Sequence, residues 1–479
     1  MFLNVFITLN TLAIFGYFLF NFYFILYSKR ENFDMFVGTD SNAYPVQIIL
    51  VIVSYIISYL YLYFTSGYGY IVLNITLSIF YKMWYFYLFS ILYIFFSVTL
   101  ISIIFTAIFY KNEMFIFLNA IFIIFVGGHV MLLANNFFIF FIGYEFLLLP
   151  SFVILYKYAK TYRCVEAAYV MFFWTQFGSF FIMLVLFLFV ANYKIATFSD
   201  LNTIIINNSD LKMIIIFLLI GFGVKMPIWP FYSWLPKAHV EASTNFSIFL
   251  SGVLVKLAFL GFLKFLLYIN TDIYGWYLYL WMLLGILEVS QKLFYQTDLK
   301  KIIALTTVIE MHWLVFTVLH TTSLLYYSAV LMFISHALIS SLFFILADCI
   351  SRRFKTRNIY EITGLWLKAP VLSAFILITN VIFLGFPYTS LFLSEFLFFL
   401  AILDINPMLF FFFVFILYFC NPIIIFRAWV MVLYGKSWIQ TDYKYEKNYY
   451  DLTLTESLII FFFISHLIVL GVCPIINLM

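Results

Sequence analysis

The chain has 479 residues, of which 66% are hydrophobic and 10% are charged, against about 25% charged residues in a typical soluble domain. A chain this apolar cannot cover a water-facing surface, so soluble enzymes and nucleic-acid-binding proteins are excluded and lipid is the expected surrounding. The abundance of Phe (66 residues) and Tyr (37 residues) is typical of AT-rich coding, as in many mitochondrial genomes.

Fourteen stretches are long and apolar enough to span a bilayer, which takes about 20 residues. In chain order they cover 2–27, 46–64, 84–109, 114–133, 137–157, 167–190, 213–235, 242–269, 274–294, 302–320, 324–348, 370–402, 408–434 and 456–473. The first stretch has no preceding basic region and no small-residue cleavage site, so a removable signal peptide is not expected. The sequence therefore predicts an all-α, polytopic membrane protein.

Two of the predicted spans are interrupted. Pro227 and Pro230 break the seventh, and Gly385 and Pro387 break the twelfth; such breaks persist in a membrane only where protein or a polar cavity satisfies the freed backbone groups. The two broken helices are five apart, and because five is odd, a five-helix repeat must be inverted relative to its twin. We predict a single transmembrane domain in four parts: N-terminal helices (1–110), a first repeat (114–269), a second repeat (274–434) and a C-terminal helix (456–473).

The basic residues test this number of helices. If residues near the end of a span are counted with the adjoining loop, 18 of the 25 Lys and Arg residues go with loops after odd-numbered helices and four with loops after even-numbered helices, and three lie well inside spans. A missing or additional helix would destroy this asymmetry, which follows the positive-inside rule. The odd-numbered loops are expected to face the matrix or the cytoplasm, with both termini on the opposite side.

Four charged residues lie near the middle of apolar spans: Glu145, Lys225, Lys256 and Glu395. Each costs about 3 kcal/mol to insert into a bilayer on the translocon scale, and such groups commonly line ion or proton pathways. Burial favours the neutral amine of a lysine, whereas a nearby carboxylate favours the ammonium, so a buried lysine beside a carboxylate is suited to exchanging a proton. Snorkelling is the competing interpretation, but Lys225 has about ten residues to either interface and snorkelling serves residues near helix ends.

The four cysteines, Cys164, Cys349, Cys420 and Cys473, lie far apart, with no CxxC motif and no histidine at ligand spacing. Fe–S, zinc and disulfide interpretations are therefore weak. We expect no cofactor or metal in this chain, and any redox chemistry is expected in another subunit.

Several segments resemble one known family. Residues 224–256 read VKMPIWPFYSWLPKAHVEASTNFSIFLSGVLVK, similar to the KMP…WLPKAHVEAP pattern of NADH–ubiquinone oxidoreductase chain 4, an antiporter-like membrane subunit of respiratory complex I. QTDLKKIIALTTVIEM at 296–311, ISHALISSLFFILAD at 334–348 and GFPYTSLFLSEF at 385–396 resemble later helices of that family. The resemblance runs from about residue 127 to about residue 435, and WLPKAHVEA separates the chain from the related chains 2 and 5.

The resemblance implies a row of proton-translocating residues through the middle of the membrane. It gives Glu145 as the partner of Lys225, Lys256 as the second lysine, His336 as a histidine of helix 11 and Glu395 as the last carboxylate. A structural role for His336 is equally compatible with the sequence. Two charges about 7 Å apart interact by roughly 2.4 kcal/mol at an effective dielectric of about 20. This energy is comparable with moving one charge through about 100 mV.

The chain departs from the family pattern in helix 10, where Glu310 occupies the place of a histidine and His312 follows two residues later. At about 100° per residue these side chains point to different faces, and we expect Glu310 to line the path. His239 and Glu241 lie near the positively flanked membrane face, where they either guard proton uptake or cap the next helix. Lys264 is interpreted as an interfacial anchor.

The resemblance also implies function. The expected activity is proton translocation coupled to NADH–ubiquinone electron transfer, with NAD, FMN, Fe–S clusters and ubiquinone bound by other subunits. Expected partners are chain 2-like and chain 5-like antiporter subunits and lipids. The expected location is the mitochondrial inner membrane, with odd-numbered loops in the matrix and both termini in the intermembrane space.

Three alternatives remain open at this stage. One is a subunit of a stand-alone multi-subunit cation/proton antiporter, and another is a structural membrane scaffold for the complex. The third is chain 5 of the same complex, which normally carries a long C-terminal extension.

Overall fold

The structure is a computed structural model that describes residues 97–110, 114–159, 161–201, 206–269, 276–319, 322–405, 407–416, 421–434 and 451–472. The predicted spans 2–27 and 46–64, and the first half of 84–109, lie outside the described residues. Within the described ranges the regular elements are helices, apart from isolated bridges between Asn136 and Thr197 and between Asp298 and Asn358.

The first half of the described chain consists of a helical segment and eleven labelled elements. They are Ser97–Phe109, α4 (Met114–Leu133), α5 (Phe137–Glu145), α6 (Leu148–Lys157), α7 (Tyr162–Tyr193), α8 (Phe198–Leu201), α9 (Asn208–Lys225), η3 (Phe231–Ser233), α10 (Trp234–Glu241), α11 (Thr244–Phe249), η4 (Leu250–Leu254) and α12 (Val255–Ile269). The bounds of α4 are those predicted from the sequence, and the predicted span 137–157 is present as α5 and α6.

The second half contains nine helices in its described ranges. They are α13 (Trp276–Phe294), α14 (Leu299–Val318), α15 (Ser323–Phe354), α16 (Leu365–Lys368), α17 (Pro370–Phe383), α18 (Ser390–Ile405), α19 (Pro407–Val414), α20 (Asn421–Tyr434) and α21 (Leu454–Val472). Most of these bounds lie within a few residues of the predicted spans; α15 runs six residues further than predicted.

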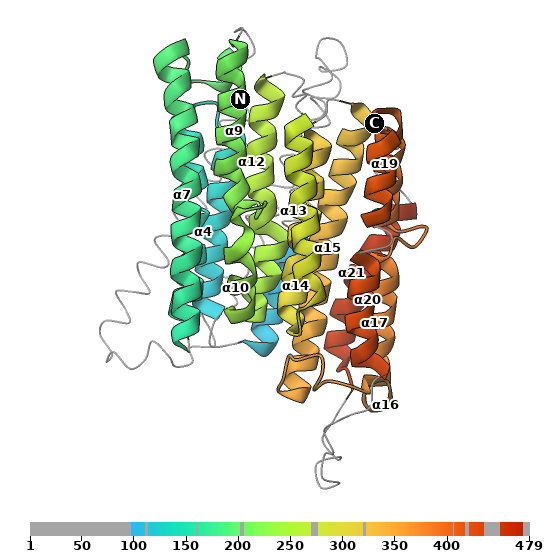
Figure 1. Cartoon of the computed structure of the whole chain (residues 1–479). Coiled ribbons are helices and arrows are strands. Elements are labelled where there is room, and N and C mark those ends of the chain that lie inside the picture. Colours follow the sequence, from blue (N-terminus) through green and yellow to red (C-terminus); the bar gives the residue numbers. More distant parts are fainter. Residues whose placement is uncertain are drawn as a thin grey trace, which may run out of the picture.

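The long helices stand side by side, from α7 at one end of the row to α17, α20 and α21 at the other (Figure 1). Among the described residues, seven helices are long and apolar enough to cross a membrane, which confirms a polytopic all-α membrane protein. The spans Thr244–Ile269 and Leu324–Phe354 are buried throughout their apolar windows, whereas only a third of the window in α21 is buried. Helices that are apolar on all faces are suited to the centre of the bundle, where they face protein, and to its outside, where they can face lipid.

Both interruptions predicted from proline and glycine are present. The α-helix ends at Lys225, and residues 226–230 lead into η3 and α10. The second break lies between α17 and α18, where Gly385 and Tyr388 adopt left-handed backbone conformations with φ of 76° and 72°. A third interruption, between α5 and α6, has no proline or glycine at its two linking residues and was not predicted.

A π-helical turn, η4, separates α11 from α12 and ends directly before the turn that carries Lys256. Such turns contain one residue more than an α-helical turn and occur frequently at functional sites. The turn is fully enclosed by protein, since all five of its residues are buried. It therefore sets the direction in which the side chains at the start of α12 point into the helix bundle.

A buried ionic network ties α21 to the end of α15. The Arg352 guanidinium donates to Asp348 Oδ2 at 2.6 Å and to Glu456 Oε1 at 2.8 Å. Arg353 donates to Glu456 Oε2 at 2.6 Å. Glu456 is almost completely buried, so its carboxylate relies on these two guanidinium groups in place of water.

Candidate functional site

Lys225 and Glu145 lie at the ends of two helices that meet inside the bundle. Lys225 is the last residue of α9, is 7% exposed, and donates from Nζ to the carbonyl oxygen of Tyr144 at 3.0 Å. Its ammonium also lies 3.5 Å from the centre of the Tyr144 ring. Glu145 ends α5 and interacts electrostatically with Lys225. The predicted pair is brought together, but the lysine's hydrogen bond goes to the backbone beside the carboxylate.

Within the described residues, only one of the two carboxylate oxygens of Glu145 has a hydrogen-bond partner. Oε2 accepts a hydrogen bond from Gln176 Nε2 at 3.1 Å, whereas Oε1 is buried without a hydrogen-bond partner. Gln176 lies near the middle of α7 and was not among the predicted site residues. The only amide side chain in the middle of that span is the sequence signal that identifies it.

The other predicted residues form a second group, centred on Lys256. Lys256 is 2% exposed, and its Nζ donates to the carbonyl oxygen of Ser251 in the π-helical turn. It interacts electrostatically with Glu310 of α14 and with His336 of α15. Glu310 in turn interacts with Glu395 of α18. Four helices therefore contribute one ionisable residue each to a single buried group.

Aromatic packing explains why Glu310 and Glu395 are neighbours. Trp313 lies three residues after Glu310, Phe398 lies three residues after Glu395, and their ring centres are 4.6 Å apart. This contact holds α14 against α18 at the level of the two carboxylates. Buried atoms in the group still lack hydrogen-bond partners, namely Glu310 Oε2 and His336 Nδ1. Polar atoms in such positions are usually hydrated, so ordered water is expected around them.

His239 extends the second group toward the face of the odd-numbered loops. Its buried ring stacks on Phe344 with centres 4.5 Å apart and interacts electrostatically with Lys256 and Lys300. Neither ring nitrogen has a hydrogen-bond partner, so His239 does not cap α11. Glu241 accepts a hydrogen bond from the thiol of Cys164 at 3.1 Å and thereby connects the end of α10 to α7.

His312 contacts different neighbours from Glu310, as their spacing predicts. His312 is completely buried, and its Nε2 accepts a hydrogen bond from the backbone N–H of Trp229 at 2.8 Å. Its Nδ1 lies 2.8 Å from the carbonyl oxygen of Val308. His312 therefore points to the break after α9, while Glu310 points to Lys256 and Glu395.

Lys264 differs from its sequence-based interpretation. It is not an interfacial anchor, because its side chain is buried between helices and its Nζ donates to the carbonyl oxygens of Leu132 at 2.8 Å and Ala134 at 2.5 Å. These carbonyls belong to the end of α4, where the helix leaves acceptors unpaired and carries partial negative charge. The ammonium of Lys264 thus stabilises a helix end, and no local pattern in the sequence indicates which helix that is.

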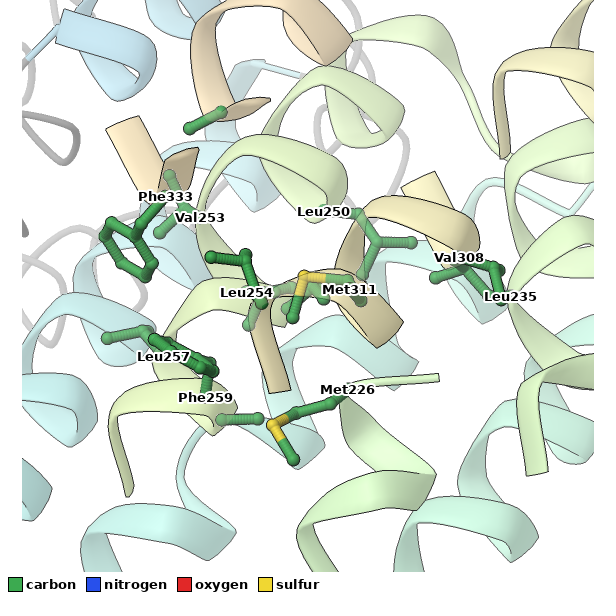
Figure 2. Close-up of a cluster of buried hydrophobic side chains, with 14 of the residues drawn as sticks. Met226, Leu235, Leu250, Val253, Leu254, Leu257, Phe259, Val308, Met311 and Phe333 are labelled. Carbon is green, nitrogen blue, oxygen red and sulfur yellow. The ribbon is translucent and has the colours of Figure 1, made fainter. Parts of the chain in front are cut away.

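Apolar residues adjacent in sequence to members of both groups pack together in the core. Figure 2 shows Met226, Leu254, Leu257 and Met311 in one buried cluster. Met226 follows Lys225, Met311 follows Glu310, Leu254 ends the π-helical turn before α12, and Leu257 follows Lys256 in α12. The structure therefore places the predicted residues in two groups, Glu145 with Lys225 and Lys256 with Glu310, His336 and Glu395.

The described residues contain no group of three or more His, Cys, Asp or Glu side chains arranged to hold a metal ion. Cys164 and Cys349 are buried free thiols. Cys420 and Cys473 lie outside the described residues.

These features define a class: a polytopic membrane protein of the antiporter-like kind, with broken helices and ionisable side chains buried between them. The sequence model of one family, described as NADH:quinone oxidoreductase/Mrp antiporter, transmembrane, matches residues 134–420. The chain belongs to this family, because the match covers more than half of its length, and within it to the complex I chain 4 and subunit M group.

Individual relatives support this assignment. The chain is 35% identical over 233 residues to NADH-ubiquinone oxidoreductase chain 4 of Paramecium tetraurelia, covering 49% of each chain. It is 32% identical over 264 residues to the chain 4 of Acanthamoeba castellanii, covering 54% of this chain and 52% of the other. NADH-quinone oxidoreductase subunit M of Rickettsia typhi is 32% identical over 266 residues, covering 54% and 53%. The matches thus span about half the length of these relatives.

Solved structures show that the fold is shared more widely. A chain of the membrane-bound sulfane sulfur reductase, an archaeal respiratory membrane complex, superposes with a TM-score of 0.73 at 22% identity over 89% of this chain and 72% of that one. A chain of the Mrp complex from a Dietzia species superposes with a TM-score of 0.71 at 14% identity over 82% of each. At these identities the likeness concerns the fold alone.

Proposed function

We propose that the chain translocates protons across a membrane as a subunit of respiratory complex I, coupled to NADH–ubiquinone electron transfer in other subunits. The observation that carries this proposal is the buried group of Lys256, Glu310, His336 and Glu395, contributed by four separate helices. Packing alone gives no reason to bury four such residues together. Groups at this depth mark ion or proton pathways in membrane proteins.

The residues have complementary roles in this proposal. The pair of Glu145 and Lys225 receives a charge change from the neighbouring subunit, because Lys225 lies at a helix break where its surroundings can rearrange. Lys256 passes the change on to Glu310, with His336 beside it, and Glu395 ends the row. Coupled sites of this kind titrate as a set, so the protonation of one residue depends on the charge of the next. His239 and Glu241 are proposed to assist proton uptake.

The proposal includes the finer organisation predicted from the sequence. The chain has about fourteen transmembrane helices with two inverted five-helix repeats, in the mitochondrial inner membrane. Odd-numbered loops face the matrix and both termini face the intermembrane space. Its partners are chain 2-like and chain 5-like subunits, and NAD, FMN, Fe–S clusters and ubiquinone are bound elsewhere in the complex.

The decisive test replaces Lys225 with alanine in the assembled complex and measures the proton-to-electron ratio in sealed membrane vesicles. We expect a reduced ratio at normal complex content, because the variant lacks the first lysine of the row. Lys237→Ala is the matched control, since Lys237 is 56% exposed and lies 3.8 Å from Glu166 in a surface ion pair. A full ratio in Lys225→Ala would remove Lys225 from the mechanism.

A stand-alone cation/proton antiporter is the second candidate, favoured by the structural likeness to the Mrp complex chain. It predicts sodium-dependent transport in membranes that lack an NADH dehydrogenase partner. Co-purification separates the two, because a complex I subunit enters a very large assembly with flavin and Fe–S clusters. A scaffold role predicts normal pumping after Lys225 and Lys256 are neutralised together.

A further inference from the structure

The two ionisable groups have different neighbours, and a mechanical link between them would add to the electrostatic interaction of their charges. Lys225 interacts with Glu145, and Lys256 interacts with Glu310, while Met226 and Met311 pack in the apolar cluster of Figure 2. Coupling between sites requires an element that both sites contact. The segment after Lys225 provides such an element, through Trp229.

Trp229 is held by the second half of the chain through all of its hydrogen-bonding groups. Its backbone N–H donates to Nε2 of His312, and its carbonyl oxygen accepts from the indole of Trp281 at 2.7 Å. Its own indole N–H donates to Glu288. The partners come from α13 and α14, whereas Lys225, four residues earlier, is bound to the carbonyl of Tyr144 in α5. The break thus joins helices of both halves.

The ring of His312 is fixed from both sides. Because Nε2 accepts from the Trp229 N–H, the ring proton of the neutral imidazole lies on Nδ1 and is donated to the carbonyl of Val308. Gly285 of α13 packs directly against the ring, and a Cβ at that position would overlap Nε2. Because both ring nitrogens are hydrogen-bonded, the ring has no free lone pair with which to accept a proton and act as a relay.

We propose that His312 is a positioning residue that couples the break beside Lys225 to Glu310 through its hydrogen bond with Trp229. This inference deepens the proposed proton translocation and rests on it. Glu310 lies two residues before His312 on the same helix, so a displacement of the break is transmitted to α14 through the ring. His312 itself carries no proton in this scheme. It sets the position of Glu310 relative to Lys256 when Lys225 changes its charge.

The test compares two substitutions in the assembled complex. In His312→Gln the amide oxygen can accept from the Trp229 N–H while the amide nitrogen donates to the Val308 carbonyl. His312→Leu fills the space with neither bond. We expect His312→Leu to lose as much of the proton-to-electron ratio as Lys225→Ala loses, and His312→Gln to retain most of it. NADH oxidation is measured in the same vesicles, so a general loss of activity is distinguished from a loss of coupling.

His466 provides a matched control histidine. It lies in α21, and its Nδ1 makes the same kind of contact as His312, 2.7 Å from the carbonyl oxygen four residues earlier. His466→Leu is expected to leave the proton-to-electron ratio unchanged. Normal ratios in both His312 variants would overturn the proposal. Equal losses in both, at normal complex content, would also overturn it, because they would indicate that the imidazole itself carries the proton.

A second measurement does not depend on pumping. Nitrogen NMR of the full chain in its complex, labelled at histidine and assigned with His312→Gln, reports which ring nitrogen carries hydrogen. We expect the Nδ1–H tautomer at His312 in the native protein. The Nε2–H tautomer would overturn the link to Trp229, even if the substitutions prevent assembly. If Lys225→Ala pumps normally while the Nδ1–H tautomer is found, the proposed function fails and the link stands as a structural contact.

Discussion

The break after α9 and the break before α18 arise from the same residue types but have opposite surroundings. In the first, Met226 and Ile228 are buried, and the backbone of Trp229 is bound by α13 and α14. In the second, Phe386 is 53% exposed and Tyr388 is 72% exposed. At these two breaks proline and glycine decide where the helix ends, and the neighbouring helices decide whether the break is enclosed in the bundle or open on one side.

A glycine of a neighbouring helix touches each break. Gly285 of α13 lies against His312 and Trp229 at the first break, where the contacted atoms are side-chain atoms. Gly471 of α21 lies against the backbone of Tyr388 and Thr389 at the second. The second break is thus covered on one side by α21, whose position depends on the ionic network at Glu456.

The largest effect is expected when the anchor of α21 is removed. Glu456→Ala leaves Arg352 and Arg353 without their shared carboxylate, and breaking a buried ion pair in this way costs about 3–5 kcal/mol. The midpoint of thermal unfolding of the purified complex is the measurement. The comparison predicts that the region of the second break loosens first, which is measured as faster amide hydrogen exchange near Phe386 than near Trp229. Equal exchange at both breaks would contradict it.

The next largest effect is the loss of stability when alanine replaces the glycine at each break. Gly471→Ala places a methyl group against backbone atoms, which cannot rotate away, and overpacking of this kind costs about 1–3 kcal/mol. Gly285→Ala meets the His312 ring and the Cβ of Trp229 and is expected to destabilise by a smaller amount in the same range. Thermal unfolding of the two variants measures the difference. A larger loss at Gly285 would show that the first break is the more rigid of the two.

The smallest effect concerns the left-handed residues of the second break. Gly385→Ala is expected to destabilise by about 1–2 kcal/mol, because a side chain disfavours φ near 76°. Tyr388→Gly removes the same strain at φ 72° from an exposed side chain and is expected to stabilise by at most about 1 kcal/mol, since glycine loses more backbone entropy on folding. Opposite shifts of the unfolding midpoint are the expected result. Shifts of the same sign would contradict the backbone assignment.

The sequence predicts those features of the fold that are caused by residues close together along the chain. Pro227, Pro230, Gly385 and Pro387 predicted both breaks, and the spacing of Glu310 and His312 predicted that they face different helices. Contacts made across the bundle were not predictable in this way. Lys264 was expected as an interfacial anchor and instead is buried against the end of α4, about 130 residues earlier along the chain, a contact that depends on how the two helices pack.

The candidate site follows the same division. Burial of Lys225 and Lys256 could be predicted because both lie in the middle of apolar spans. The grouping of the site could not, because it depends on which helices bring Glu310, His336 and Glu395 to Lys256. The role of Gln176 and the binding of Trp229 by three partners are likewise products of tertiary packing, with no periodic pattern to indicate them.

The π-helical turn at Leu250–Leu254 makes the direction of Lys256 sensitive to a single residue of chain length. Removing one residue there would restore regular α-helical winding and rotate everything before the turn by about 100° relative to α12. Ser251 would leave the Lys256 ammonium, and α11 would turn a different face toward α15. A sequence alignment with relatives that ignored this extra residue would therefore assign the wrong inward-facing side chains to α11.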